Sequence, residues 1–316
     1  MGSEPIGVVG AGLMGHGIAQ VFAAAGHSVT VVDSNAEIFD AARTKVRRNL
    51  QLLVEYEMLD AERAAQTPDR IAYRTDLAAL GDATLVIEAV TEDAEIKRAL
   101  YAELAPHLSD AAVLTTNTSS IPLSVLADAT GRPDRFTTSH FFRPAYICPM
   151  VEVTKGAQTS EATVETVIRL LRGAGLRPVR INIDLPGQVA NRLRQALFRE
   201  ALDLVDRGVI SAEDIDELVA FSFSPRMPMM GVIKDRDLAG LEIAQSGADR
   251  VWPDLSQKQQ AHDRLRDLVE AGHYGLKTGR GFYDWSDVDF AEVWETLERQ
   301  QLEIFRTLRK LGVLSV

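Results

Sequence analysis

Short, nearly uninterrupted apolar runs alternate with stretches of helical periodicity from Ile6 to about Ile183. Such runs are typical of strands that are buried on both faces, and helices between successive strands predict a mostly parallel sheet. The predicted strands occupy residues 6–9, 29–32, 85–87, 113–116, 136–139, 151–153 and 178–181.

Beyond Asp184 only helical periodicity remains, over residues 186–207, 211–220, 238–251, 254–271 and 290–311. Because Pro186 suits the first turn of a helix, the sequence predicts a boundary between a domain at 1–184 and a helical domain at 185–316.

Two helical patterns at about residues 36–66 form an insertion in the first domain. The insertion is longer than a βαβ crossover needs, so we expect it to project over the site.

Composition narrows the classes of function. The net charge of −11 argues against nucleic acid as the main partner and gives no sign of a polybasic membrane anchor. The sequence has no run of about 18 uncharged apolar residues, so it predicts no membrane span. Cys148 is the only cysteine, which rules out an internal disulfide and favours a reducing cytoplasm. One cysteine and six scattered histidines give no pattern for a metal site.

The first apolar run leads into a glycine-rich turn, in which the pattern GxGxxG comprises Gly10, Gly12, Leu13, Met14 and Gly15. The pattern follows a strand and opens a helix, which is the context of a dinucleotide site. The three glycines permit the tight turn, the approach of pyrophosphate and close packing of the helix on the sheet. We therefore predict an α/β fold: a Rossmann-type, mostly parallel sheet domain followed by an all-helical C-terminal domain.

Asp33 ends the second predicted strand, where a carboxylate accepts hydrogen bonds from the hydroxyls of the adenosine ribose. Its charge repels the additional phosphate of NADP, and Ser34 and Asn35 behind it provide no arginine for that phosphate. The predicted cofactor is therefore NAD.

Several blocks of sequence resemble the 3-hydroxyacyl-CoA dehydrogenase family. The most specific is Ser139-His140-Phe141-Phe142-Arg143-Pro144, with Glu152 twelve residues after the histidine. The other blocks are Val86-Ile87-Glu88-Ala89-Val90-Thr91-Glu92 with Lys97, Asn117-Thr118-Ser119-Ser120-Ile121, Asp184-Leu185-Pro186-Gly187-Gln188-Val189-Ala190-Asn191-Arg192, and Gly275-Leu276-Lys277-Thr278-Gly279-Arg280-Gly281-Phe282-Tyr283. They follow the order of the family from residue 6 to about 285.

The resemblance implies catalytic roles. His140 would be the general base that takes the hydroxyl proton, and Glu152 would orient its ring and stabilise the imidazolium. Imidazole suits this role because its pKa lies near working pH. Ser119 would hydrogen-bond the reacting oxygen, and Asn191 would help to hold the substrate. The alternative for Ser119 is a helix cap, and for Asn191 an ordinary polar residue early in a helix.

The resemblance also implies that Glu92 and Lys97 line the nicotinamide-ribose side and that Asn117 braces the loop that carries Ser119. Lys97 lies on a helix that otherwise has a solvated pattern, so a purely structural role is the alternative for this residue.

Arg143 departs from the family, which usually has asparagine at this position. A guanidinium is a planar fork suited to a carboxylate, so Arg143 is predicted to bind a free carboxylate of the substrate. Pairing with a neighbouring acidic side chain is the alternative.

Glu55 and Glu57, near the end of the insertion's first helix, stand where lysines meet coenzyme A phosphates in acyl-CoA members. Their negative charges would repel these phosphates, and Arg47 and Arg48 partly compensate that repulsion.

The tail, residues 290–311, has apolar residues at helical spacing and resembles extensions in relatives that act on small free acids. We expect this apolar stripe to pack on the second domain or on a partner subunit, and we expect a homodimer.

The sequence as a whole predicts an NAD-dependent dehydrogenase that oxidises a 3-hydroxy acid to a 3-oxo acid, acting on a free acid rather than a CoA thioester. A short-chain 3-hydroxyacyl-CoA dehydrogenase is the main alternative. Two alternatives are more distant. One is an enzyme that oxidises an aldehyde hydrate with the same histidine, and the other is a non-catalytic NAD-binding structural protein.

Overall fold

The computed structural model describes residues 3–314, and the chain forms two compact units that divide after Asn191. Within the described residues, no helix combines the length and the apolar character needed to cross a bilayer.

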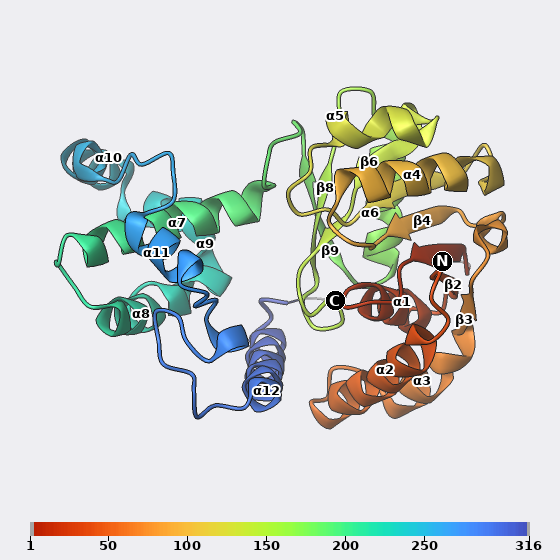
Figure 1. Cartoon of the computed structure of the whole chain (residues 1–316), viewed down its shortest axis with the longest axis horizontal. Helices are drawn as coiled ribbons and strands as arrows, with labels where there is room; N and C mark the ends of the chain where they lie inside the picture. The colour runs from red at the N-terminus through yellow and green to blue at the C-terminus, as the bar shows by residue number, and fades with distance from the viewer. Residues whose placement is uncertain (1–2, 315–316) are drawn as a thin grey trace. The chain divides into compact units, whose positions relative to one another are not determined.

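The first unit is built on a six-stranded sheet in which every neighbouring pair is parallel (Figure 1). The order along the sheet is β3-β2-β1-β4-β5-β6. The chain thus reverses its direction of travel across the sheet between β1 and β4, and ligands of such sheets bind beyond the strand ends at this reversal. The strands are β1 (Pro5–Val9), β2 (Ser28–Val32), β3 (Ile71–Arg74), β4 (Leu85–Glu88), β5 (Val113–Thr116) and β6 (Phe136–Thr138).

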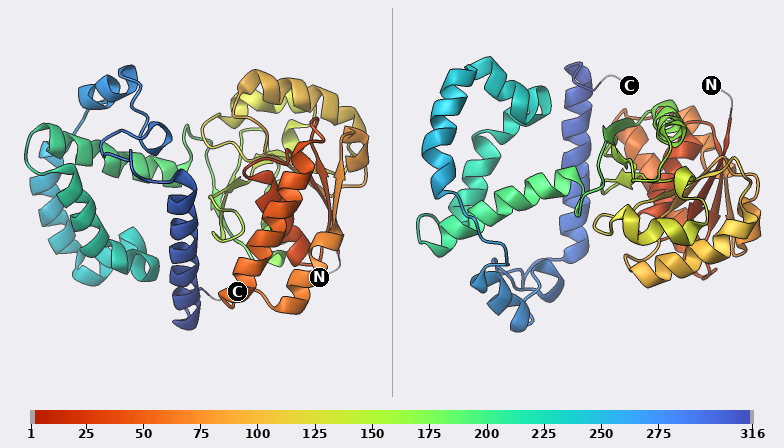
Figure 2. Two further views of the ribbon diagram at one scale, coloured as in Figure 1. Left: turned by 60° about the horizontal axis from the view of Figure 1, so that its bottom comes forward. Right: turned by 90° about the horizontal axis from the view of Figure 1, so that it is seen from above.

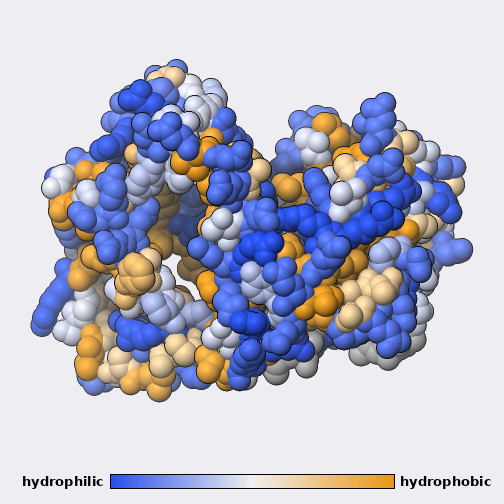
Figure 3. All heavy atoms as spheres, turned by 90° about the horizontal axis from the view of Figure 1, so that it is seen from below, coloured by the Kyte–Doolittle hydropathy of each residue, from blue (hydrophilic) through white to orange (hydrophobic). Residues whose placement is uncertain are grey.

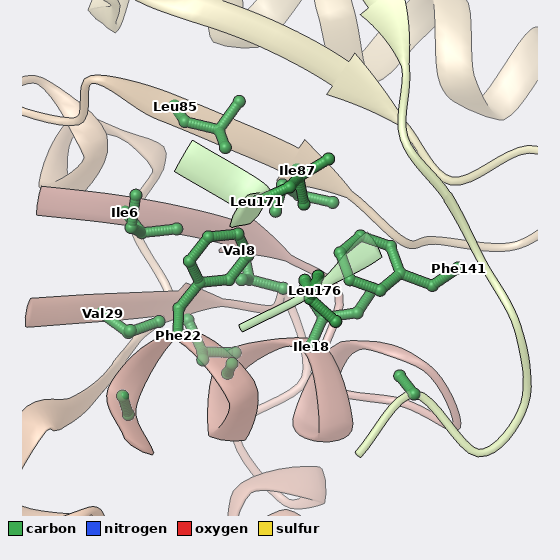
Figure 4. Packing of buried hydrophobic residues seen from close by; sticks show 14 of the residues in the cluster. Ile6, Val8, Ile18, Phe22, Val29, Leu85, Ile87, Phe141, Leu171 and Leu176 are labelled. Carbon is green, nitrogen blue, oxygen red and sulfur yellow. The ribbon is translucent and has the colours of Figure 1, made fainter. Parts of the chain in front are cut away.

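Helices cover both faces of this sheet (Figures 1 and 2). They are α1 (Gly15–Ala24), α2 (Ile38–Glu55), α3 (Ala61–Gln66), α4 (Ala94–Leu104), α5 (Leu123–Leu126) and α6 (Glu161–Gly173). Val8 packs in one core cluster with Ile18 and Phe22 of α1 (Figure 4), whereas the next residue, Val9, packs in a second cluster with Leu104 of α4. Successive strand residues point to opposite faces, so continuous apolar runs are needed to fill two cores.

A smaller sheet of β7 (His140–Phe141), β8 (Met150–Thr154) and β9 (Arg177–Ile181) follows. The predicted strands at 151–153 and 178–181 therefore lie in a second sheet, in which β7 runs antiparallel to β8. The predicted run 136–139 ends at Thr138, and His140 begins β7. Hydroxyl groups join the two sheets: Thr137 donates to the carbonyl of Thr154, and the amide of Thr154 donates to Thr138 Oγ1 at 2.9 Å.

The insertion is helical, as predicted, and consists of α2 and α3. The strand pattern missed β3, which follows the insertion at the edge of the sheet. Of its residues only Ile71 is fully buried. An edge strand faces solvent on one side and does not need a continuous apolar run.

The second unit consists of helices joined by turns and irregular segments. They are α7 (Val189–Asp206), α8 (Ala212–Phe221), α9 (Met227–Ala239), α10 (Leu241–Val251), α11 (Asp263–Glu270) and α12 (Phe290–Lys310). Helix α7 begins in the last residues of the first unit.

Two predictions for this unit were wrong. Residues 255–262 are not helical, because the backbone amide of Ser256 bonds to Glu200 at 2.7 Å and only Asp263 begins α11. The sequence pattern also missed α9, which Gly231 interrupts with a φ of 68°. The apolar residues of α9 do not gather on one face, so helical periodicity does not mark this segment.

Candidate active site

The turn after β1 brings backbone segments very close together. Gly10 has a φ of 101°, and a Cβ there would lie 2.7 Å from the carbonyl oxygen of Ala89. A Cβ on Gly15 would lie 1.8 Å from the carbonyl oxygen of Gly10. In contrast, nothing lies within 4 Å of the position of a Cβ on Gly12. Two of the glycines are thus required by packing, and the third leaves open space beside the backbone.

Helix α1 starts at Gly15 without a side-chain cap from Met14 and without an acidic residue in its first turn. Its N-terminal amides and the positive end of its dipole therefore suit a phosphate group. The turn faces a cleft of about 830 Å³. The cleft is lined by Val9, Gly10, Gly12, Leu13, Met14, Val32, Asp33, Ser34, Ile38, Thr75, Leu77, Ala89, Val90, Thr91, Ile96, Ala99, Leu100 and Glu103.

Asp33 borders the same cleft, directly after β2. Its carboxylate accepts hydrogen bonds from the backbone amides of Ala11 at 2.8 Å and Asn35 at 3.0 Å. Asp33 thus links the end of β2 to the glycine turn, while Ile96, Ala99 and Leu100 provide an apolar wall from α4. An uncapped helix terminus, open backbone and a carboxylate at the end of β2 together fit NAD.

His140 and Glu152 are direct partners in the antiparallel pair of β7 and β8. The Nδ1 atom of His140 lies 2.8 Å from Oε2 of Glu152, and the residues are only 6% and 4% exposed. With an ionised carboxylate as acceptor, Nδ1 carries the proton and Nε2 is the basic nitrogen of the ring. The ring of Phe142 packs against that of His140, with 4.9 Å between the ring centres.

The second oxygen of Glu152 has a different task. Oε1 accepts hydrogen bonds from the amides of Val189 at 3.0 Å and Ala190 at 2.8 Å, at the first turn of α7. Burial raises the pKa of Glu152, but the hydrogen bonds from His140 and from these amides outweigh it and hold the pKa below its ordinary value. Asn191, the next residue in α7, is half-buried. Glu152 therefore connects the histidine to the backbone that carries Asn191.

Glu92 holds the loop that carries Ser119. Its Oε1 atom accepts hydrogen bonds from the hydroxyl of Thr118 at 2.6 Å and the amides of Ser119 at 2.9 Å and Ser120 at 3.0 Å. The carboxamide oxygen of Asn117 accepts from the amide of Phe141 at 2.8 Å. The loop is thus tied both to Glu92 and to β7, the strand that carries the histidine.

Lys97 is almost completely buried, at 1% exposure, although its helix has a solvated pattern. Its Nζ atom lies 2.6 Å from Oε1 of Glu88 and 3.5 Å from Oε2 of Glu92. Sequence reasoning did not select Glu88, which binds this cation, or Tyr101 and Thr116, whose hydroxyls donate to the other oxygen of Glu88. One feature of the sequence could have pointed to Glu88: it is a carboxylate at the end of β4, a strand that is buried on both faces.

Arg143 lies two residues after β7, in the segment that leads to β8, and its side chain is exposed. Apart from Arg143 and Asn191, the predicted site residues of the first unit fall into two groups. Gly10, Gly12, Leu13, Met14 and Asp33 border the cleft, with Gly15 packed behind the turn, while Ser119, His140, Glu152, Glu92, Lys97 and Asn117 belong to linked hydrogen-bond networks at the ends of β4, β5 and β7.

The fold and the dinucleotide cleft define a nucleotide-binding protein of the Rossmann type. Residues 5–185 match the NAD binding domain of 3-hydroxyacyl-CoA dehydrogenase, and residues 187–285 match its C-terminal domain. The chain therefore belongs to the 3-hydroxyacyl-CoA dehydrogenase family and is an NAD-dependent dehydrogenase, as the sequence predicted.

Similar proteins include enzymes named for different substrates. A probable 3-hydroxybutyryl-CoA dehydrogenase of Deinococcus radiodurans is 36% identical over 88% of this chain and 99% of its own. The 5-formyl-3-hydroxy-2-methylpyridine 4-carboxylate 5-dehydrogenase of Mesorhizobium japonicum is 33% identical over 88% of this chain and 89% of its own.

Similar solved structures are also named for both free-acid and CoA substrates. A crystal structure of a 5-formyl-3-hydroxy-2-methylpyridine 4-carboxylic acid 5-dehydrogenase, described as an NAD+ dependent dismutase, is 30% identical and superposes with a TM-score of 0.88 over 98% of both chains. The (S)-3-hydroxybutyryl-CoA dehydrogenase of Ralstonia eutropha, also 30% identical, gives 0.76 over 90% of this chain and 99% of its own.

The depressed pKa of Glu152 predicts a pH-dependent contribution to stability. A carboxylate whose pKa is lowered by folding stabilises the protein above its unfolded pKa of about 4.3, and this contribution is lost as pH falls through the folded value. We expect urea unfolding between pH 3 and 6 to show a stability difference between wild type and Glu152→Gln that shrinks on acidification. Glu165→Gln, an exposed site on α6, controls for the loss of one charge. A difference that grows on acidification would contradict the prediction.

Proposed function

We propose that the protein oxidises a secondary alcohol β to a carboxyl group, a 3-hydroxy acid to a 3-oxo acid, with His140 as general base. The observation that carries this proposal is the buried contact of 2.8 Å between His140 Nδ1 and Glu152 Oε2. Because Nδ1 is engaged by the carboxylate, Nε2 is the ring nitrogen with a lone pair to accept a proton.

In this mechanism His140 Nε2 takes the hydroxyl proton while the carbinol hydrogen departs as hydride and the C–O bond becomes a carbonyl. NAD, when bound, supplies the nicotinamide carbon that accepts the hydride. The imidazolium that forms stays hydrogen-bonded to Glu152, whose negative charge stabilises it. Ser119 donates a hydrogen bond to the reacting oxygen, and Asn191 helps to hold the substrate.

The remaining site residues are proposed to bind the cofactor. Gly10, Gly12 and Gly15, with Leu13 and Met14, hold the pyrophosphate at the start of α1. Asp33 accepts hydrogen bonds from the adenosine ribose. Glu92, Lys97 and Asn117 contribute on the nicotinamide-ribose side.

Replacement of His140 tests the base directly. His140→Gln preserves much of the side-chain volume but removes the basic nitrogen, so we expect kcat to fall by roughly 10²- to 10⁴-fold. The dissociation constant for NAD, measured by NADH fluorescence and competition, should stay within about twofold because His140 does not border the dinucleotide cleft. Unchanged turnover in this variant would refute the mechanism.

A free carboxylic acid is the proposed substrate, rather than a CoA thioester. Arg143 offers a permanently charged planar fork, which suits a carboxylate. Glu55 and Glu57 near the end of α2 would repel the phosphates of coenzyme A. The pyridine-carboxylate dehydrogenase superposes on this chain with a TM-score of 0.88, compared with 0.76 for the Ralstonia thioester enzyme.

A 3-hydroxyacyl-CoA substrate is the second candidate. It is favoured by the many relatives that are named for CoA substrates, including the 3-hydroxybutyryl-CoA dehydrogenase of Mycobacterium tuberculosis, 36% identical over 89% of this chain.

Arg143→Ala separates these two candidates. A charge-assisted hydrogen bond contributes about 1.5–3 kcal/mol, so the KM for a hydroxy acid should rise roughly 10- to 100-fold. The KM for a neutral analogue, such as the methyl ester, should change far less, as measured by NADH absorbance. Equal effects on both compounds would refute a carboxylate contact. Potent inhibition of the wild type by acetoacetyl-CoA would favour the thioester instead.

We also infer that two copies of the chain associate. The second unit exposes large apolar side chains to an unusual degree: Phe221 and Ile233 are each 80% exposed, and Trp252 is 69% exposed. Figure 3 shows apolar patches that reach the surface of one face of the molecule. Many exposed large apolar side chains favour an association surface, and homodimers are the commonest form of association.

Sedimentation equilibrium at micromolar concentration should therefore give twice the chain mass of 34.7 kDa. Substitution of Phe221 and Ile233 by serine should shift the equilibrium toward the monomer, because each change removes exposed apolar surface from the contact. A monomer mass for the wild type over this range would contradict the inference.

A further inference from the structure

Glu88 places a charged group in the interior of the first unit. Its side chain is fully buried at the end of β4. Four donors surround its carboxylate: the amide of Val90 at 2.8 Å, Lys97 Nζ at 2.6 Å, the hydroxyl of Tyr101 at 2.6 Å and that of Thr116 at 2.8 Å. Burial, together with the charge of Glu88, holds the pKa of Tyr101 well above its usual range, so its hydroxyl remains a donor.

Lys97 links this buried carboxylate to Glu92. The ammonium group lies between the two acids, 2.6 Å from Glu88 and 3.5 Å from Glu92. Because Lys97 is 1% exposed, its charge is compensated by protein groups rather than by solvent. Glu88 therefore fixes where Lys97 can sit, and Lys97 in turn attracts Glu92 Oε2.

Glu92 uses its other oxygen to organise the loop at 118–120. Burial raises the pKa of Glu92, but the hydrogen bond from Thr118 and the charge of Lys97, with contacts from Ser120, bring it below its ordinary value. The amide of Ser119 is held at 2.9 Å, whereas its hydroxyl lies at the longer distance of 3.4 Å from the same oxygen. The backbone of Ser119 is thus held firmly, and its hydroxyl only loosely.

We propose that Glu88 and Lys97 are positioning residues that act through Glu92 to hold Ser119 where its hydroxyl meets the reacting oxygen. This inference rests on the proposed function of Ser119. A small displacement of a positioned group costs turnover far more than it costs binding. This positioning role explains why Lys97 and Glu88 occupy the interior, where an apolar pair of similar volume would pack with a smaller desolvation cost.

The first test uses Glu88→Gln, which keeps the shape of the side chain and removes its charge. We expect kcat to fall roughly 10- to 100-fold. In the protein without cofactor, amide exchange in the peptide that spans residues 117–121 should be about tenfold faster, because Glu88 no longer fixes Lys97 and the position of Glu92, which holds the loop, is less constrained. Asn49→Ala, which removes a buried hydrogen bond of 3.1 Å to Gln20, is the matched control. It should lower the melting temperature and change neither readout.

A double-mutant cycle separates positioning from general destabilisation. If Glu88 acts through Ser119, adding Glu88→Gln to Ser119→Ala should lower kcat less than about twofold further. If the two substitutions lower kcat by independent factors that multiply, the proposal is overturned. Amide exchange in the loop of Glu88→Gln equal to that of the wild type would also overturn it.

Glu88→Gln leaves Lys97 buried with less compensation, which destabilises the fold, so Glu88→Gln/Lys97→Met, which removes both charges, is the second variant. The same loss of kcat and the same faster exchange are expected, and wild-type values for either would overturn the proposal. The exchange readout involves no chemistry. Failure of the proposed function would instead appear as turnover that survives His140→Gln while the loop still responds to Glu88→Gln.

Discussion

The carboxylate of Glu152 is the constraint on which the arrangement of this site depends. One oxygen engages the imidazole of His140, and the other accepts the first two amides of α7. A nearly buried carboxylate has to satisfy all its acceptor sites within the protein, so neither contact can be lost without leaving a charge uncompensated. The orientation of the histidine and the start of α7, where Asn191 lies, are consequently set by one group.

The same physical principle operates at Glu88. Parallel strands bring their carboxyl ends to one edge of the sheet, where Glu88 of β4 and Thr116 of β5 meet. The charge at that edge is compensated by Lys97 from α4, and the remaining attraction of the lysine reaches Glu92. Two buried carboxylates thus organise the polar groups of the site.

Arg143, which is proposed to recognise the substrate, is exposed in the segment between β7 and β8, whereas His140 and Glu152 are buried. This separation between a buried reacting pair and an exposed recognition group is consistent with a family in which relatives of similar fold carry the names of thioester and free-acid substrates.

Local pattern in the sequence was sufficient for much of the fold. The apolar runs, the glycine turn and Asp33 identified β1, β2 and the dinucleotide site, because these features depend on residues close together in the chain. The pairing of His140 with Glu152 was expected from the resemblance to the family, and the structure shows it across β7 and β8. Tertiary structure alone decided that β7–β9 form a second sheet, that residues 255–262 are not helical, and that Lys97 is buried between Glu88 and Glu92. Each of these features depends on contacts between distant segments, which local propensity and periodicity do not report.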